Sequence, residues 1–400
     1  MRILQINSVC GIGSTGRIAT DIHGILQKEK HESSVAFGRG DPMNCDNAYR
    51  IGNKYDTYAH LAGTRIFDKH GFYSKNATKK LIQYIKKLAP DVIHLHNIHG
   101  YYLNIEILFS FLKEHKKPIV WTLHDCWSFT GHCAHFDSAN CYNWKSACKN
   151  CIQKKEYPTS LLFDNSKKNF DMKKRLFTAI SEQDLIIVTP SDWLAALVGE
   201  SFLKKYKIKV INNGIDTTIF KPTQSNFREK YNLQNKFIVL GVASAWGKKK
   251  GFDDFIKLSG MLDDSFQIVM VGLNKKQLSE IPTNIIGIER TDSVTELAEI
   301  YSTADIFFNP TYEDVYPTTN LEAISCGTPT VVYNTGGAVE MINDDNGIII
   351  EKGNLQAFYD FLNTKPMRDF NIKQYNRFDK NKLLVEYLNL YEMLLIKETV

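Results

Sequence analysis

The sequence predicts an α/β protein with two doubly wound, parallel-sheet domains. The clearest observation is a strand–loop–helix–strand unit at 305–333, in which two short apolar runs flank a loop and a helix. A similar unit opens the chain, where the alternating segment 3–9 precedes a glycine-rich turn and a helical pattern that ends at Gln27. Between these units, Asn212–Asp216 carries the asparagine and glycine that a hinge favours. Strands that alternate with helices indicate parallel sheets, whose ligands bind beyond the carboxyl ends of the strands.

The length and composition agree with two domains that have full cores. The 400 residues are 43% hydrophobic, and we expect domains at 1–212 and 213–380, followed by a C-terminal helix at 381–400. No apolar run approaches the roughly 20 residues that span a bilayer, and the first residues are patterned as a strand rather than a signal peptide. We therefore expect a cytoplasmic protein. A net charge of +5 permits an anionic partner, and we expect no nucleic-acid partner.

The first glycine-rich turn, Gly11–Arg17, lies between a predicted strand and a predicted helix. Glycine lets the backbone approach an anion, and a helix N-terminus offers unpaired N–H groups, so the turn predicts a phosphate site near Gly13 and Gly16. A dinucleotide-binding fold would place an acid at the end of the next strand. The predicted strand at 33–37 is followed by Gly-Arg-Gly instead, which disfavours NAD.

Residues 73–88 predict a basic helix, with Leu81 and Ile85 among apolar residues at helical spacing and lysines around them. One interpretation is an ordinary surface helix with a solvated basic face. The other is docking on an anionic membrane surface, at the inner face of the cytoplasmic membrane.

Polar residues follow two predicted strands of the first domain. The strand at 90–95 precedes His96 and Asn97, and the strand at 117–123 precedes His124. Functional residues gather at such strand ends, although a histidine there is more often structural.

The segment 126–151 holds five of the eight cysteines. Its Cys148-x-x-Cys151 pair has the spacing of half a zinc site, and Cys133 and Cys141 supply two further thiols at looser spacing. Three states stay open: a structural zinc on these four cysteines, reduced free thiols, and a disulfide, which a cytoplasmic location disfavours.

The second domain carries two charged motifs. A strand at 236–242 leads to Ser244 and to a lysine run that ends in Lys249 and Lys250, where an anion site and a solvated turn are the alternatives. Asp314 and Glu322 lie on either side of a helix start, with seven residues between them. Such carboxylates could hold hydroxyl groups on both sides of a phosphate, which suits a sugar nucleotide. Alternatively, Glu322 only favours the helix dipole.

This second motif resembles the acidic motif of retaining GT-B glycosyltransferases of family 4, which continues into Ala and Cys-Gly-x-Pro. The resemblance extends to the Asn-Gly-x-Asp hinge and to Thr-Leu-His-Asp at His124. It implies two Rossmann-like domains that face each other across a cleft, and it implies that the C-terminal helix at 381–400 joins the first domain. The family places glutamate where Asp314 stands, which makes Glu313 a rival, and arginine where Ser244 stands.

The resemblance implies metal-independent transfer of a sugar from a UDP- or GDP-linked donor to a saccharide acceptor. Within the family the chain looks most like enzymes of bacterial capsule and lipopolysaccharide synthesis, whose acceptors are lipid-linked. Because the cysteine-rich segment follows His124 and should overhang the cleft, it is a candidate for shaping acceptor choice.

The resemblance assigns roles to individual residues. Asp314, His124 and Lys250 are the implied catalytic residues, which contact the donor sugar or its diphosphate, and Glu322 contacts the ribose. His96 and Asn97 face the acceptor. The other implied donor-binding residues are Gly13, Gly16, Ser244, Lys249, Arg290, Thr291, Thr318 and Thr319.

Two other functions stay open from the sequence. A nucleotide-sugar epimerase of the same fold would bind the donor without needing an acceptor. A non-catalytic nucleotide-sugar-binding partner of another transferase would explain the serine at the arginine position. Release of nucleotide only in the presence of acceptor separates the transferase from both.

Overall fold

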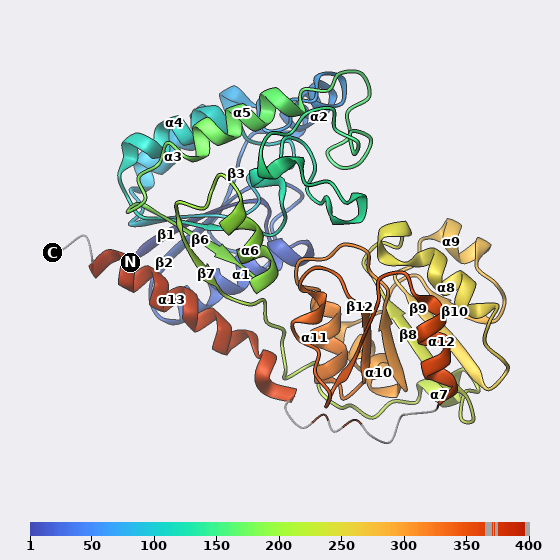
Figure 1. The fold of residues 1–400 in the computed structure, drawn as a ribbon. Helices are drawn as coiled ribbons and strands as arrows, with labels where there is room; N and C mark the ends of the chain where they lie inside the picture. The colour runs from blue at the N-terminus through green and yellow to red at the C-terminus, as the bar shows by residue number, and fades with distance from the viewer. Residues whose placement is uncertain (365–369, 371, 373–374, 397–400) are drawn as a thin grey trace. The chain divides into compact units, whose positions relative to one another are not determined.

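The computed structural model describes residues 1–364, 370, 372 and 375–396 (Figure 1). The chain divides into two compact units. Unit 1 contains Met1–Asn212 and the chain from Leu384 onward, and unit 2 contains Asn213–Leu383. Residues 397–400 of the expected C-terminal helix lie outside the described residues.

Unit 1 is built on a seven-stranded sheet whose strand pairs are all parallel. The spatial order is β3 (Ala48–Arg50), β2 (Glu32–Arg39), β1 (Arg2–Val9), β4 (Val92–Leu95), β5 (Ile119–Thr122), β6 (Leu185–Thr189) and β7 (Lys207–Val210). The helices are α1 (Gly13–Lys28), α2 (Lys54–Phe67), α3 (Lys75–Leu88), α4 (Ile105–His115), α5 (Ser166–Phe177), α6 (Asp192–Glu200) and, from Leu384 onward, α13 (Lys380–Ile396).

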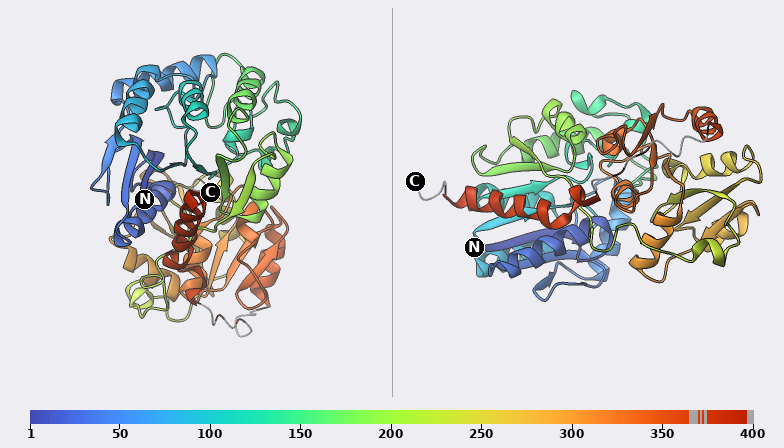
Figure 2. Two further views of the ribbon diagram at one scale, coloured as in Figure 1. Left: turned by 90° about the vertical axis from the view of Figure 1, so that its left-hand side faces the viewer. Right: turned by 90° about the horizontal axis from the view of Figure 1, so that it is seen from below.

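Helix α13 packs in the core of unit 1, although it follows unit 2 in the sequence. Its residues Leu384, Tyr387 and Tyr391 recur at helical spacing, and their side chains are buried in one cluster with Ile3 and Ile22. Both views of Figure 2 place this helix beside the N-terminal strand and α1. The predicted amphipathic pattern of the C-terminal segment thus explains why the chain returns to the first unit.

Unit 2 is built on a six-stranded sheet, again with parallel pairs only. The spatial order is β10 (Ile285–Ile288), β9 (Phe266–Val271), β8 (Phe237–Val242), β11 (Ile306–Asn309), β12 (Thr330–Tyr333) and β13 (Gly347–Ile350). The helices are α7 (Phe227–Lys230), α8 (Phe252–Ser259), α9 (Lys275–Glu280), α10 (Val294–Thr303), α11 (Thr318–Ser325) and α12 (Leu355–Asn363).

Both faces of the unit 2 sheet are buried. On strand β8, Ile238 and Leu240 belong to one apolar cluster, while Val239 between them belongs to another. Because successive side chains of a strand point to opposite faces, a strand covered on both sides is apolar at every position. This explains the continuous apolar run from which the strand was predicted.

Helix α3 confirms the predicted basic helix but changes its interpretation. Ala77, Leu81 and Ile85 on its apolar face are buried, and the helix packs against α4. The centre of the apolar face is therefore covered within the unit, and the exposed side chains of this helix are polar, most of them lysines. Burial of Leu81 and Ile85 removes the apolar part of the expected membrane contact, while docking of the lysines on an anionic surface stays a prediction.

Within the described residues, we find no helix that combines the length and the apolar character needed to cross a bilayer.

Candidate functional site

In unit 2 the predicted lysine turn and the predicted acidic loop lie side by side. Lys250 Nζ is 2.5 Å from Asp314 Oδ2, and Lys249 Nζ is 2.8 Å from Glu313 Oε2. The backbone N–H of Tyr312 also donates to the carbonyl of Lys249 at 2.8 Å. Two segments more than sixty residues apart therefore form one charged site, beyond the carboxyl ends of β8 and β11.

Glycine lets these two segments approach each other. Gly251 closes the lysine turn with φ of +74°, and a Cβ at this position would lie 2.4 Å from Pro310 in the acidic loop. Gly336 has φ of +53°, and its Cβ would lie 1.9 Å from the carbonyl oxygen of Asp314. Only glycine accommodates both the left-handed backbone and the contact.

The two rival acids, Glu313 and Asp314, have different environments. The Glu313 side chain is 2% exposed and is paired with Lys249, so it holds the acidic loop against the lysine turn. The Asp314 side chain is 19% exposed, and its second oxygen accepts from the N–H of Tyr316 at 3.2 Å. Asp314 is therefore the acid that a ligand can reach, in agreement with its spacing to Glu322.

Glu322 lies on α11, is largely buried, and is held by a residue that the sequence analysis missed. The hydroxyl of Tyr301 donates to Glu322 Oε2 at 3.0 Å. Burial and the nearby carboxylate raise the pKa of Tyr301 well above its usual value, so the hydroxyl keeps its proton. Thr318 and Thr319 form the first turn of α11 and are half-buried. The only sequence signal for Tyr301 was its place on the apolar face of α10.

A pocket of about 470 Å³ lies at the ends of β8, β9 and β10. It contains the predicted donor-binding residues Ser244 and Arg290, together with Glu289, which was not predicted. Lys250, Asp314, Glu322 and the predicted Thr291 are not among its lining residues. The complete lining is Ser244, Ala245, Trp246, Gly272, Leu273, Asn274, Gln277, Glu289 and Arg290.

In unit 1 the predicted histidines form a hydrogen-bonded chain at the ends of β4 and β5. His96 Nδ1 lies 3.1 Å from His124 Nε2, and His96 Nε2 lies 3.0 Å from Gln5 Oε1. The ring of His94 packs 4.0 Å from that of His96, and its Nδ1 lies 2.6 Å from the hydroxyl of Tyr391. The chain thus connects β1, β4, β5 and α13.

These histidines are neutral at physiological pH. Burial lowers the pKa of His124 to about 4 and lowers the pKa of His96 well below its usual range. An amide oxygen only accepts, so His96 donates from Nε2 to Gln5 and accepts from His124 at Nδ1. His124 then carries its proton on Nε2, and its Nδ1 is an acceptor. We infer this tautomer from the hydrogen bonds.

The expected acceptor role of His96 needs correction. Its ring is buried and both ring nitrogens have protein partners, so His96 orients His124 and does not face a ligand. Asn97 is half-buried; its backbone N–H lies 3.3 Å from Asn7 Oδ1, and its carbonyl accepts from Tyr102. No hydrogen bond of the Asn97 side chain is found in the described part of the chain.

The two glycines of the first turn differ in accessibility. Gly13 is exposed with φ of +65°, and a Cβ there would have no neighbour within 4 Å. Gly16 is buried, and its Cβ would lie 3.1 Å from the N atom of Gly11. Gly13 is therefore open to a ligand, while Gly16 shapes the turn.

His99 and Asp125 form a second polar pair that the sequence analysis did not assign. His99 Nε2 lies 2.8 Å from Asp125 Oδ2, and His99 Nδ1 lies 3.0 Å from the hydroxyl of Tyr157. Burial raises the pKa of Asp125, but His99 outweighs burial, and the pKa falls to about 2. Through His99, Asp125 beside His124 is thus linked to Tyr157, which lies just after the cysteine-rich segment.

Of the four cysteines expected to bind zinc, Cys133 and Cys151 are in direct contact. Cys133 is hydrogen-bonded to Cys151, which lowers the pKa of Cys151 to about 7, while Cys148 Sγ accepts from the N–H of Gly131 at 3.2 Å. All cysteines are free thiols, and among the described residues no group of three or more His, Cys, Asp or Glu side chains could hold a metal ion. The zinc stays a prediction, which elemental analysis of protein kept from chelators can test.

Comparison with known families agrees with this geometry. The sequence pattern described as Glycosyltransferase Family 4 matches residues 15–219, which is more than half of the chain. The chain belongs to this glycosyltransferase family. A second pattern, described as Glycosyl transferases group 1, matches residues 223–382 of the glycosyltransferase.

One relative matches the glycosyltransferase along its whole length. It is WcaC of Escherichia coli K12, described as a colanic acid biosynthesis glycosyl transferase, and it is 24% identical over 98% of this chain and all of WcaC. An N,N'-diacetylbacillosaminyl-diphospho-undecaprenol alpha-1,3-N-acetylgalactosaminyltransferase of Campylobacter jejuni is 31% identical over 36% of this chain and 40% of that enzyme.

Solved structures show the same GT-B fold. HepE of Anabaena in complex with UDP has a TM-score of 0.69 at 14% identity, over 98% of this chain and all of HepE. WaaG, a glycosyltransferase involved in lipopolysaccharide biosynthesis, has a TM-score of 0.64 at 16% identity, over 98% of this chain and 99% of WaaG.

Proposed function

We propose that this glycosyltransferase moves a sugar, with retention of configuration, from a UDP- or GDP-linked donor to a lipid-linked saccharide of a cell-surface polysaccharide. The observation that carries the proposal is the contact between Lys250 and Asp314 next to the first turn of α11. HepE has been crystallised with UDP and with UDP-glucose, which supports a nucleotide-sugar donor. The Campylobacter relative is named for a diphospho-undecaprenol acceptor, which supports a lipid-linked one.

The charged site can neutralise a leaving diphosphate without a divalent metal ion. Lys250 and the unpaired N–H groups of α11 are donors for the negative charge that develops as the sugar–phosphate bond breaks. The acceptor oxygen forms its bond to the sugar on the face that the diphosphate leaves, and its proton passes to the departing phosphate oxygen. We assign no protein nucleophile, and Asp314 binds and orients the sugar beside Lys250.

Unit 1 contributes a neutral acceptor of hydrogen bonds. With its proton on Nε2, His124 presents Nδ1, which can accept from a sugar hydroxyl group. A neutral imidazole suits a hydroxyl group better than an imidazolium does, because both nitrogens of the charged form are donors. We propose that His124 contacts the donor sugar, and that Asn97 contributes to the acceptor site.

A thermal-shift screen of nucleotide sugars, followed by a transfer assay, tests this function. A donor present at 100 times its dissociation constant should stabilise the protein by about 2.7 kcal/mol. Free nucleotide should then appear only when a lipid-linked saccharide is added. An epimerase would interconvert the donor without an acceptor, and a non-catalytic partner would bind the donor and release no nucleotide; either result contradicts the proposal.

A further inference from the structure

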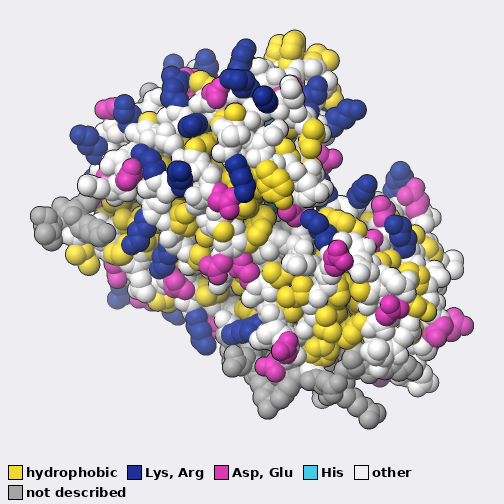
Figure 3. All heavy atoms as spheres, in the orientation of Figure 1, with side chains coloured by type: hydrophobic (Ala, Val, Ile, Leu, Met, Phe, Trp, Pro, Cys, Tyr) yellow, Lys and Arg dark blue, Asp and Glu magenta, His cyan; other side chains and the backbone are white. Residues whose placement is uncertain are grey.

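A group of large apolar side chains is exposed at the end of α2 in unit 1. Ile66 and Phe67 end this helix, and the turn Leu161–Phe163 lies beside them, all with exposed side chains. Leu161 and Leu162 are the most exposed of the group, at 64% and 66%. We call these five residues the apolar tip. Figure 3 shows hydrophobic side chains gathered at this edge of the molecule, where Figure 1 places α2 and the neighbouring loop.

Backbone pairing and ring stacking join the two segments of the apolar tip. The N–H of Leu161 donates to the carbonyl of Arg65 at 2.7 Å, and the N–H of Phe163 donates to the carbonyl of Ile66 at 3.2 Å. The rings of Phe67 and Phe163 stack with their centroids 5.7 Å apart. The apolar side chains are thus held in a fixed arrangement on the surface.

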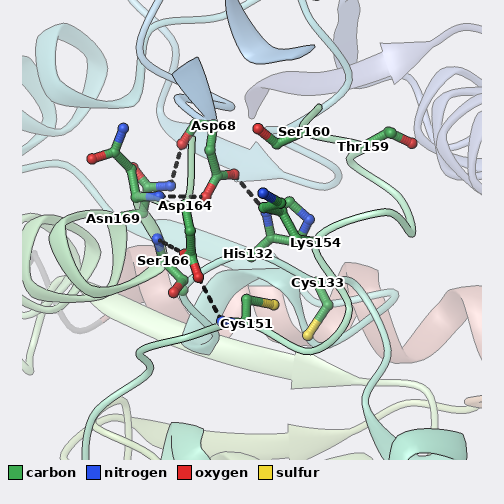
Figure 4. Close-up of polar contacts among 12 residues, drawn as sticks. Asp68, His132, Cys133, Cys151, Lys154, Thr159, Ser160, Asp164, Ser166 and Asn169 are labelled. Carbon is green, nitrogen blue, oxygen red and sulfur yellow. Dashed lines mark hydrogen bonds and ion pairs between the residues drawn. The ribbon is translucent and has the colours of Figure 1, made fainter. Parts of the chain in front are cut away.

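A buried polar network beneath the apolar tip fixes its position (Figure 4). Asp68 is fully buried; its Oδ1 lies 2.5 Å from His132 Nδ1, and its Oδ2 accepts from the N–H of Asn165 at 2.8 Å. Asp164, the residue after the turn, accepts from the N–H groups of Cys151 and Ser166 at 2.7 and 2.9 Å. These contacts anchor the end of α2 and the residues that follow the turn, so the exposed side chains of the tip sit on a fixed backbone.

Cationic side chains flank the apolar tip along the chain, together with the exposed carboxylate of Asp164. Arg65, Lys69 and Lys155 are exposed, and Lys154 Nζ donates to the carbonyl of Leu162 at 3.3 Å. Basic residues beside leucine and phenylalanine are typical of a surface that lies in the interface of an anionic membrane. The core of a protein–protein interface is depleted of lysine, and a stable interface buries more than about 1,000 Å². The composition therefore favours lipid over a second protein.

We propose that the apolar tip docks on an anionic lipid surface, with its leucines and phenylalanines in the acyl–headgroup boundary and its cations at the headgroups. Docking would bring the enzyme to its lipid-linked acceptor, and only this consequence rests on the proposed function. The apolar contact with the membrane is thus made by the tip at the end of α2, where apolar side chains are exposed, and not by the buried apolar face of α3.

Co-sedimentation with vesicles tests the proposal. The wild-type protein should bind vesicles that contain phosphatidylglycerol more tightly than vesicles of phosphatidylcholine alone. Part of this binding should survive high salt, because salt screens the charges but leaves apolar insertion in place. In the triple variant Leu161→Ser, Leu162→Ser and Phe163→Ser, we expect the partition coefficient to fall at least about tenfold. The thermal midpoint should not change, because these side chains are exposed.

Two control variants make the result specific. Val294→Ser with Ile349→Ser removes exposed apolar side chains from unit 2, and should bind vesicles like the wild type. The quadruple glutamate variant of Lys79, Lys80, Lys86 and Lys87 removes the cations of α3 and should retain the salt-resistant binding.

Three results would overturn the proposal: no binding of anionic vesicles by the wild type, a triple variant that still binds, or a wild-type dimer that the triple variant turns into a monomer. The last result would make the tip an interface between two copies. The thermal shift with nucleotide sugars, measured on the same samples, reports the proposed function independently. Loss of vesicle binding with an intact shift rejects the docking alone, and the reverse rejects the donor site alone.

Discussion

The two units share an architecture, a parallel sheet with helices, but differ in the polar side chains that they contain. All eleven histidines of the chain lie between His23 and His135 in unit 1, which also holds seven of the eight cysteines. Unit 2 has no histidine, and its site consists of lysine–carboxylate pairs and a buried glutamate. Fixed charges suit an anionic ligand over a wide pH range, whereas histidines buried as neutral groups make stability depend on pH, because the unfolded chain protonates them near pH 6.5. We therefore expect ligand chemistry to depend on unit 2, and pH dependence of stability to arise in unit 1.

The largest expected effect is the loss of charge stabilisation in unit 2. Lys250→Ala removes the donor closest to Asp314, and Asp314→Ala removes the reachable acid of the loop. We expect each variant to lower kcat by about 10²–10³-fold, because preorganised charge contacts have effects of that size. Steady-state transfer kinetics measure the effect. The neighbouring Lys248→Ala is the matched control, and equal kinetics for all three variants would contradict the assignment.

The second prediction is that acid destabilises unit 1 specifically. His124 and His60 have pKa values lowered to about 4 and about 3 by burial, and those of His94 and His96 are also lowered. The unfolded chain takes up protons below about pH 6.5 that the folded unit does not, so stability falls as pH falls from 6.5 toward 4. The slope is about 1.4 kcal/mol per pH unit and group. His132 acts in the opposite direction, because Asp68 raises its pKa against the effect of burial.

Tryptophan fluorescence can report unit 1 alone. Four of the five tryptophans lie in unit 1, and Trp246 lies in unit 2. In a Trp246→Phe variant, the thermal midpoint seen by fluorescence should drop between pH 7 and pH 5. A constant midpoint over this range would show that the histidines are not buried as neutral groups.

The third prediction separates positioning from contact within unit 1. In His96→Ala the Nε2 proton of His124 loses its partner, so the imidazole is less well oriented. We expect kcat to fall about tenfold, because the free energy that one hydrogen bond contributes corresponds to a factor of that order. The KM of the donor should change little. His115→Ala on α4 is the control. A rise in KM without a change in kcat would show that His96 contacts substrate directly.

The sequence predicted the elements that are buried on both faces more accurately than the exposed ones. Strand β12 ends the predicted unit at 305–333 and was predicted at its observed bounds, because a strand covered on both faces is a continuous apolar run. Strands β3 and β13 were not predicted, since each is short and mostly half-exposed. For α3 the pattern identified the helix but could not show that α4 covers its apolar face.

The residues of the site could be predicted only where they belong to a sequence motif. The resemblance implied that Lys250 and Asp314 both contact the donor, but their direct contact was not predicted, since no local pattern relates residues 64 positions apart. Tyr301 belongs to no motif, and its role depends on how α10 packs against α11. Cysteine spacing gave four candidate ligands but no pairing, because pairing depends on the path of the loop. The apolar tip was likewise not predicted, because its two segments are distant in the sequence and meet only in the fold.

The smallest expected effect concerns the support of Glu322. Tyr301→Phe removes only the hydroxyl that donates to Oε2, while the ring still fills its place in the core. We expect donor affinity to fall a few-fold, by about 0.5–1.5 kcal/mol, which is the net contribution of one hydrogen bond. Glu322→Ala should weaken nucleotide binding more strongly, because it removes the ligand contact itself. Isothermal titration with the nucleotide alone measures both variants. The acid sensitivity of unit 1 should be the same in both, since neither changes a histidine. If Tyr301→Phe binds the nucleotide as poorly as Glu322→Ala, then Tyr301 does more than hold the carboxylate, and the hydroxyl itself belongs to the nucleotide site.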